Sequence, residues 1–360
     1  MQNSIQSRTF GQLADGKIVE AWVLRGSGGL VVEAIAYGAT VTRILVPDRE
    51  GRCVDVALGF SDLESYLQPH PYFGSIVGRV AGRLSGASFE LNGHRYKLTS
   101  NDSPNHLHGG NTGLHRRLWS ARVGEKDANI PCIRFEYQSP NGEEGYPGAV
   151  DIAVEYSITP NNALLVEITA ESDTVTPFSP TSHIYFNLCG ESSGSIEGHE
   201  LQILADSYVP ADPRMTLADR LDATEGTCED FRQPQILERA IDGLFQRHGS
   251  LYLLSKQAEN SPLLQTAARL QDHQGGRTMR VLTTESFLQF YSGSQLDGSL
   301  VGKSGVAYQK HAGLCLECHG YPNGPNCPGL EDISLRPGQL RRSTTAYVFG
   351  NAGTNEEQMS

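Results

Sequence analysis

The stretch Ala149-Val150-Asp151-Ile152-Ala153-Val154-Glu155-Tyr156-Ser157-Ile158 alternates apolar and polar side chains, and this period of two decides the fold class. Side chains of a β-strand point alternately to opposite faces, so the pattern predicts a half-buried strand. Residues 164–169 and 278–283 show a similar pattern. Between Phe89 and Tyr96, the pair Asn92-Gly93 separates two β-prone flanks, which is typical of a hairpin turn.

Helical patterns are few. Residues 61–67 and 235–239 are the two candidates, and neither alternates with strands in a β-α-β order. The 39 glycines and 18 prolines are spread along the 360 residues and separate many short strand-like segments. We therefore expect an all-β protein, a sandwich or barrel. No repeat and no long linker divides the chain, so we expect residues 1–349 to form one domain and 350–360 a disordered tail.

Composition limits the classes of partner. The formal net charge of −12 argues against nucleic acid, because an acidic protein repels phosphate. No apolar run reaches the ~18–20 residues that a membrane helix needs. The polar start, Met1 to Ser4, shows no secretory signal, so we expect a cytoplasmic location. Seven cysteines do not suggest a disulfide framework, and most are expected to be reduced thiols.

Cys315-Leu316-Glu317-Cys318-His319 matches the C-x-x-C-H pattern of covalent haem attachment. The pattern is short, and the expected location offers no oxidising export route, so we expect no haem. The preceding Ala312-Gly313-Leu314 suits a buried strand. A glutamate within such an apolar run is either on the solvent-facing side or functional, and periodicity alone favours the solvent-facing side for Glu317.

His106-Leu107-His108 would place two imidazoles on one face of a strand, as in some metal sites. Gly109-Gly110-Asn111 follows, and no carboxylate lies nearby in the sequence. We therefore expect no metal, and one structural histidine beside one functional histidine. The sequence also has no phosphate-binding loop, dinucleotide fingerprint or G-x-S-x-G motif.

Four scattered segments carry candidate functional groups: two combine glycines with guanidinium, imidazole or amide groups, a third holds a histidine and an asparagine, and a fourth holds the glutamate. They are residues 78–84, 105–110, 181–188 and 314–317. With these segments the chain resembles the aldose 1-epimerase (galactose mutarotase) family, from about Phe10 to Phe349. Further similar segments follow in the family's order: Tyr37-Gly38-Ala39-Thr40, Pro47-Asp48, Leu58-Gly59-Phe60, Pro71-Tyr72-Phe73-Gly74, Glu143-Glu144-Gly145-Tyr146-Pro147-Gly148, Gln289-Phe290-Tyr291 and Arg342-Ser343-Thr344-Thr345. Each match is short, and the order and spacing together carry the resemblance.

The resemblance implies a large antiparallel β-sandwich, the mutarotase-like supersandwich, with its site in an open cleft. It implies interconversion of the α and β anomers of a free aldose. His183 would be the general acid and Glu317 the general base. The residues implied to hold or line the sugar are Arg83, His108, Tyr185, Asp242 and Gln289. The implied partner is therefore a small sugar, bound by a monomer or weak homodimer.

The chemistry independently asks for these residue types. One group must take the proton of the C1 hydroxyl while another protonates the ring oxygen, and carboxylate and imidazole both exchange protons near neutral pH. The open aldehyde then rotates about C1–C2 and closes on its other face. No hydride moves and no covalent adduct is needed, so we expect neither a cofactor nor a metal.

Several positions depart from the usual residues of the family. Glycine or serine replaces asparagine before Arg83 and His183, and different pairs follow Asp242 and Glu317. The departing residues are Gly82, Ser182, Gly243, Leu244, Cys318 and His319. Because lost hydrogen-bond partners alter specificity, the sugar could be an unusual aldose or another hemiacetal. Two alternatives stay open: a non-catalytic sugar-binding protein on the same fold, and an epimerase of a phosphorylated hexose.

Overall fold

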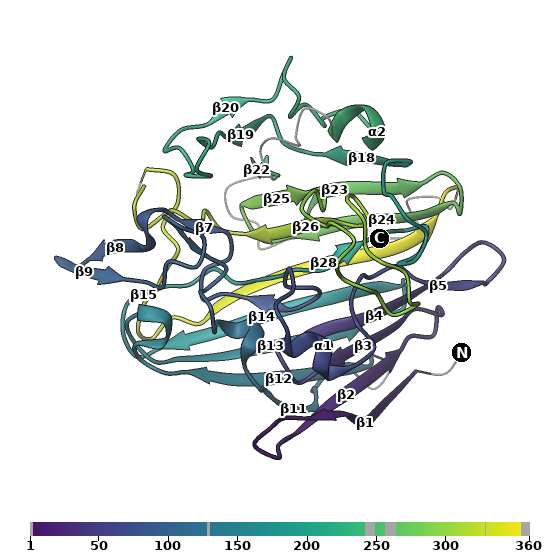
Figure 1. The fold of residues 1–360 in the computed structure, drawn as a ribbon, viewed down its shortest axis with the longest axis horizontal. Helices are drawn as coiled ribbons and strands as arrows, with labels where there is room; N and C mark the ends of the chain where they lie inside the picture. The colour runs from purple at the N-terminus through teal and green to yellow at the C-terminus, as the bar shows by residue number, and fades with distance from the viewer. Residues whose placement is uncertain (1–2, 128–129, 242–248, 256–263, 328, 354–360) are drawn as a thin grey trace.

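The computed structural model describes residues 3–127, 130–241, 249–255, 264–327 and 329–353. Within these ranges the chain forms three larger sheets and four two-stranded ones, and neighbouring strands pair antiparallel (Figure 1). Two short α-helices interrupt them, α1 (Leu63–Leu67) and α2 (Leu237–Ala240). The short 3-10 turns are η1 (Ser85–Ala87), η2 (Leu114–Arg116) and η3 (Glu143–Gly145). The predicted all-β antiparallel class is confirmed.

A nine-stranded sheet spans the molecule. Its order is β11 (Ser120–Val123), β12 (Cys132–Ser139), β13 (Val150–Ile158), β14 (Ala163–Ser172), β28 (Arg341–Asn351), β24 (Arg277–Thr283), β23 (Gln265–Asp272), β18 (His199–Ile203) and β21 (Gln235–Ile236). The five-stranded sheet is β1 (Ser4–Gln12), β2 (Ile18–Arg25), β3 (Val31–Ile35), β4 (Thr40–Pro47) and β5 (Cys53–Asp55). Figure 1 shows β1 and β2 at the lower edge of the molecule, at the opposite side from β19 and β20.

A six-stranded sheet carries much of the site. Its order is β17 (Tyr185–Phe186), β26 (Leu314–His319), β25 (Phe287–Tyr291), β22 (Ser250–Leu253), β19 (Ser207–Val209) and β20 (Asp222–Ala223). The strand pairs are β6 (Ile76–Val77) with β16 (Thr181–Ser182), β7 (Arg83–Leu84) with β10 (His106–Leu107), β8 (Ser88–Leu91) with β9 (His94–Lys97), and β15 (Thr176–Pro177) with β27 (Ser334–Leu335).

Strand β13 is the alternating stretch from which the fold was predicted, and it pairs with β12 and β14. Its apolar residues, from Val150 to Ile158, enter the main core. The other face is less exposed than predicted, because Ala153 and Ser157 are also buried. Ala153 is small, and its register partners on the neighbouring strands are the larger residues Glu136 and Thr169. The prediction of a half-buried strand was therefore wrong at these two positions.

The hairpin prediction is confirmed by β8 and β9, with Asn92 and Gly93 both at positive φ between them. Helix α1 lies within the first predicted helix, and Asp62 caps it by accepting the Ser65 N–H. Helix α2 begins two residues later than the second predicted helix, because residues 235–236 form strand β21. All seven cysteines are free.

The single-domain organisation stays a prediction, supported by one buried cluster that includes side chains from Val19 to Phe349. Strand β28 runs through Asn351, so it includes the first two residues of the predicted tail, while residues 354–360 lie outside the described residues. No helix in the described part of the chain is long and apolar enough to cross a membrane.

The buried Tyr156 hydroxyl on β13 donates to the Ala39 carbonyl, in the turn between β3 and β4, at 2.7 Å. Tyr156→Phe leaves that carbonyl without this donor, so we expect the free energy of unfolding to fall by about 1–3 kcal/mol. Tyr347→Phe is the matched control, because its hydroxyl makes a longer bond to the Leu316 carbonyl, at 3.4 Å. Urea unfolding of both variants checks this; an equal or larger loss in Tyr347→Phe would contradict it.

Candidate active site

Strand β26 places the predicted base in the interior. Cys315, Glu317 and His319 point to one face of the strand and the residues between them to the other. All six residues of the strand are buried, and Glu317 is 2% exposed. Periodicity alone favoured the solvent-facing side for Glu317, and that interpretation was wrong. Within its sheet the strand lies between β17 and β25. The segment around His183 covers the face of the strand from which Glu317 projects.

The backbone of His183 is held between two strand pairings. Strand β16 before it pairs with β6, and β17 after it pairs with β26. The His183 N–H donates to the Ser75 carbonyl at 2.9 Å, and the His183 carbonyl accepts from the Gly74 N–H at 2.9 Å. This framework places His183 Nε2 3.5 Å from Glu317 Oε1, with His183 only 4% exposed.

Burial controls the protonation of this pair. It raises the pKa of Glu317 to about 8, and the Arg83 guanidinium opposes that shift. Burial also lowers the pKa of His183 to about 3; a hydrogen bond with its own backbone opposes this shift, and the imidazoles of His70 and His319 reinforce it. At neutral pH the empty pair therefore holds one proton, on the carboxyl group. Glu317 Oε2 has no hydrogen-bond partner among the described residues, which leaves it free for a ligand.

The pair opens into a cleft of about 540 Å³. The cleft is lined by Pro71, Tyr72, Gly82, Arg83, Leu107, His108, His183, Tyr185, Gln289, Tyr291, Gln295 and Glu317. Arg83 is held by Asp102, with 2.6 Å between Nε and Oδ2. Gln289 is the register partner of Glu317 on β25. The Tyr185 ring stacks on His183 with 5.2 Å between ring centroids. The structure thus brings together six of the seven predicted site residues.

The seventh, Asp242, lies outside the described residues, as do Gly243 and Leu244. Tyr72 and Tyr291 line the cleft and were not predicted as site residues. Tyr72 belongs to a segment that carried the family resemblance, and its ring lies 4.8 Å from that of His108. Tyr291 is two residues beyond Gln289, so strand alternation could have placed both on the cleft face.

The prediction that His106 and His108 share one strand face was wrong. Strand β10 ends at Leu107, and His108 turns away with φ +51°. His106 bonds the Thr99 carbonyl at 2.7 Å and packs on Tyr146, while His108 lines the cleft. His108 Nδ1 accepts the Gly82 N–H at 3.1 Å, and burial lowers the pKa of His108 well below its ordinary value.

Steric packing explains why residue 82 is a glycine. Its φ is +74°, and a Cβ there would lie 2.6 Å from Pro322 Cγ. A longer side chain such as asparagine would have to displace this proline. The packing of Pro322 against position 82 therefore favours glycine there.

Within the described residues, one group of three donors could share a cation: His108, His183 and Glu317, whose ligand atoms lie within 4.8 Å of one another. Two imidazoles and a carboxylate suit several transition metals. The same three groups also suit hydroxyl binding and proton transfer. The expected absence of a metal stays a prediction.

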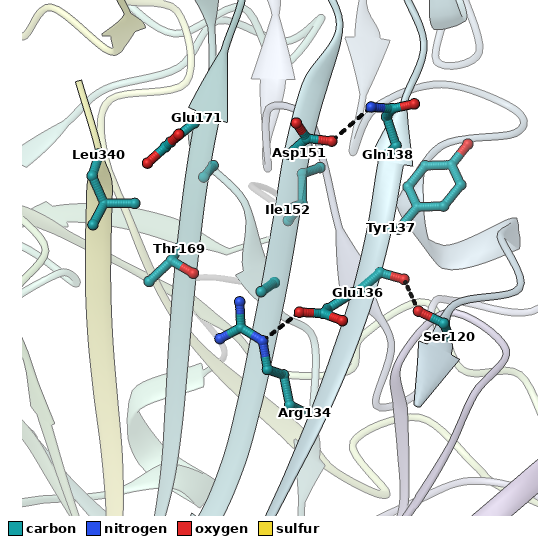
Figure 2. Close-up of a pocket in the computed structure, with 12 residues that line it drawn as sticks. Ser120, Arg134, Glu136, Tyr137, Gln138, Asp151, Ile152, Thr169, Glu171 and Leu340 are labelled. Carbon is teal, nitrogen blue, oxygen red and sulfur yellow. Dashed lines mark hydrogen bonds and ion pairs between the residues drawn. The ribbon is translucent and has the colours of Figure 1, made fainter. Parts of the chain in front are cut away.

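A larger hollow of about 810 Å³ lies on the outer face of the nine-stranded sheet (Figure 2). Several of its polar groups are paired with one another: Arg134 bonds Glu136 at 2.6 Å, and Gln138 donates to Asp151 at 2.8 Å. The smaller cleft instead holds a buried pair with strongly shifted pKa values and an unpartnered carboxylate oxygen. We therefore take the cleft as the candidate active site.

Comparison with known proteins shows the family of the chain. The model of the aldose 1-epimerase family matches residues 20–348. The galactose mutarotase of Sus scrofa is 40% identical over 352 residues, which cover 97% of this chain and 99% of that protein. The aldose 1-epimerase of Escherichia coli (strain K12) is 31% identical over 346 residues, covering 93% and 96% of the two chains.

Solved structures show the same fold. An aldose epimerase homologue from C. elegans superimposes with a TM-score of 0.81 at 26% identity, covering 91% of this chain and 97% of that one. The galactose 1-epimerase from Lactobacillus acidophilus gives a TM-score of 0.84 at 24% identity, covering 97% and 99%. From the extent of the family match and the identity to near-full-length relatives, this chain belongs to the aldose 1-epimerase family.

Proposed function

We propose that the protein is an isomerase that interconverts the α and β anomers of a free aldose. The observation that carries the proposal is the buried His183–Glu317 pair, 3.5 Å apart at the base of the cleft. Mutarotation moves protons at two oxygens bonded to the same carbon. An acid and a base this close can serve both oxygens within one bound geometry.

In the proposed mechanism Glu317 takes the proton of the C1 hydroxyl and His183 gives a proton to the ring oxygen. The C1–O5 bond breaks, and a free aldehyde forms. Rotation about C1–C2 presents the other face of the carbonyl to the O5 hydroxyl. During closure His183 takes the O5 proton back and Glu317 returns its proton to O1, which leaves the pair as it began.

The proton count of the pair is constant through this cycle. It alternates between carboxylate with imidazolium and carboxylic acid with neutral imidazole, and both states hold one proton more than the fully deprotonated pair. The directions of the two pKa shifts favour the second state in the empty cleft. Each turnover therefore requires a proton to move within the pair and none to be exchanged with solvent.

The surrounding groups are suited to hydroxyl binding. Arg83 keeps guanidinium donors beyond its Nε bond to Asp102. His108 accepts the Gly82 N–H at Nδ1, so in its neutral form Nε2 carries the proton and can donate to a sugar oxygen. Gln289 and Tyr185 complete the proposed sugar site, together with Asp242 outside the described residues.

The cleft favours a neutral sugar over a phosphorylated one. Among its described lining residues Arg83 is the one Lys or Arg, and it is already paired with Asp102. A non-catalytic sugar-binding protein would have no use for an acid and base held in contact. The cytoplasmic location, the absence of nucleic-acid partners and the monomer or weak homodimer stay predictions from the sequence.

Glu317→Gln keeps the shape of the base but removes its basicity, and His183→Asn keeps a polar group that cannot exchange a proton. We expect each to lower kcat by at least ~10²-fold, the lower end for a lost general acid or base. KM should change much less, because Arg83, His108 and Gln289 remain. Polarimetry checks this, with circular dichroism to confirm folding. Near-wild-type turnover in either folded variant would remove that residue from the mechanism.

The double variant Glu317→Gln with His183→Asn should lose less than the product of the two single losses, because both groups act in one coupled step.

The expected pH dependence of kcat/KM follows from the direction in which the pKa of Glu317 is shifted. Because its pKa is raised to about 8, the pair keeps its proton up to about that pH. Above it, both groups are deprotonated and no acid remains, so kcat/KM should fall about tenfold per pH unit. Rates without protein, subtracted at each pH, provide the control. A kcat/KM that stays level to pH 10 would contradict the assignment.

We expect weak discrimination between galactose and glucose, because Gly82 presents no polar side chain to the sugar. We predict that kcat/KM for galactose exceeds that for glucose by less than about a hundredfold, or about 2.7 kcal/mol. Steady-state rates on the pure α anomers of both hexoses measure the ratio. A larger preference for galactose would show that the altered positions do not set specificity.

A further inference from the structure

Cys315 lies against the nitrogen of His183 that faces away from Glu317. Its Sγ is 3.6 Å from His183 Nδ1, and both residues are buried. The contact is built by the sheet, because Cys315 is the register partner of Tyr185, two residues from His183, and lies two residues before Glu317 on the same strand face. One strand thus carries the groups that meet both sides of the imidazole.

The proposed acid–base cycle specifies the state of each ring nitrogen. Nε2 gives and recovers the proton, so when the ring is neutral Nε2 holds a lone pair and Nδ1 must keep its hydrogen. That Nδ1–H needs an acceptor in a dry interior. The Cys315 sulfur stands at hydrogen-bond distance and can accept weakly.

The thiol stays neutral in this position. Burial raises the pKa of Cys315 well above its ordinary value, the Glu317 carboxyl acts in the same direction, and a hydrogen bond with Tyr185 opposes both. A neutral, weak acceptor orients the ring without stabilising imidazolium as a carboxylate would. His183 can therefore remain a strong acid once protonated, in accord with its lowered pKa.

On this geometry, and resting on the acid role proposed for His183, we propose that Cys315 is a positioning residue that holds His183 in its Nδ1–H tautomer with Nε2 directed to Glu317 and the sugar. The stacked Tyr185 ring fixes the plane of the imidazole, with 28° between the two rings. Cys315 then fixes its rotation within that plane. Cys315 contacts no reacting atom and forms no covalent bond in the cycle.

The test compares Cys315→Ala, Cys315→Ser and the control Cys318→Ala. Cys315→Ala removes the acceptor, so we expect kcat to fall about tenfold with KM nearly unchanged. Cys315→Ser restores an acceptor and should recover most of kcat. Cys318 is an equally buried thiol three residues along the strand, on the opposite face, so Cys318→Ala makes a similar cavity without touching His183. It should lower stability comparably and leave kcat within about twofold of wild type.

Nitrogen-15 NMR of the imidazoles gives a readout that is independent of turnover. The His183 signals, assigned by their loss in His183→Asn, should show hydrogen on Nδ1 in the wild-type protein and a change of tautomer in Cys315→Ala. An Nε2–H tautomer in the wild type would overturn the proposal even if Cys315→Ala failed to fold. Equal kcat in folded Cys315→Ala and wild type would also overturn it. A wild-type protein without mutarotase activity would instead refute the proposed function, while the tautomer could still be read.

Discussion

Burial of one carboxyl group and one imidazole against each other is the constraint on which the rest of the site depends. In water at neutral pH, the Glu317 carboxyl would be ionised and the His183 imidazole would be mostly neutral. Neither group would then hold the proton that the mechanism needs. Removal from solvent raises the pKa of the carboxyl to about 8 and lowers that of His183 to about 3. The pair therefore retains a single proton across the neutral range, and this is the proton that the proposed mechanism uses.

The fold supplies this burial through strand alternation and through covering loops. Strand β26 directs Cys315 and Glu317 toward His183, while β16 and β17 hold the histidine backbone on both sides. Neighbouring rings exclude water, with Tyr72 and Tyr185 both within 6 Å of the His183 ring. Strand β26 itself is paired with β25 from Cys315 to His319 and with β17 at Leu314 and Cys315. Backbone hydrogen bonds thus hold the chain around the proposed acid and base, while the side-chain contacts of Cys315 and Tyr185 orient the His183 ring.

Local patterns in the sequence predicted the fold class well, because alternation and turn residues are short-range signals. The hairpin at Asn92-Gly93 and the strand at 150–158 follow directly from them. Burial of Glu317 could not be predicted in this way, since the chain that covers it lies more than a hundred residues earlier. The left-handed turn at His108 and the packing of Pro322 on Gly82 are likewise set by tertiary contacts. The family resemblance, not periodicity, identified the residues that the fold assembles.

Polarimetry of freshly dissolved pure anomers tests the central claim most directly. α-Galactose and α-glucose, each dissolved with and without the protein at pH 7, relax to a fixed equilibrium rotation through ring opening alone. The account predicts that the protein shortens the relaxation time in proportion to its concentration and leaves the final rotation unchanged. Relaxation at the uncatalysed rate for every aldose tried, with folded protein present, would contradict the account and leave a sugar-binding role on the same fold.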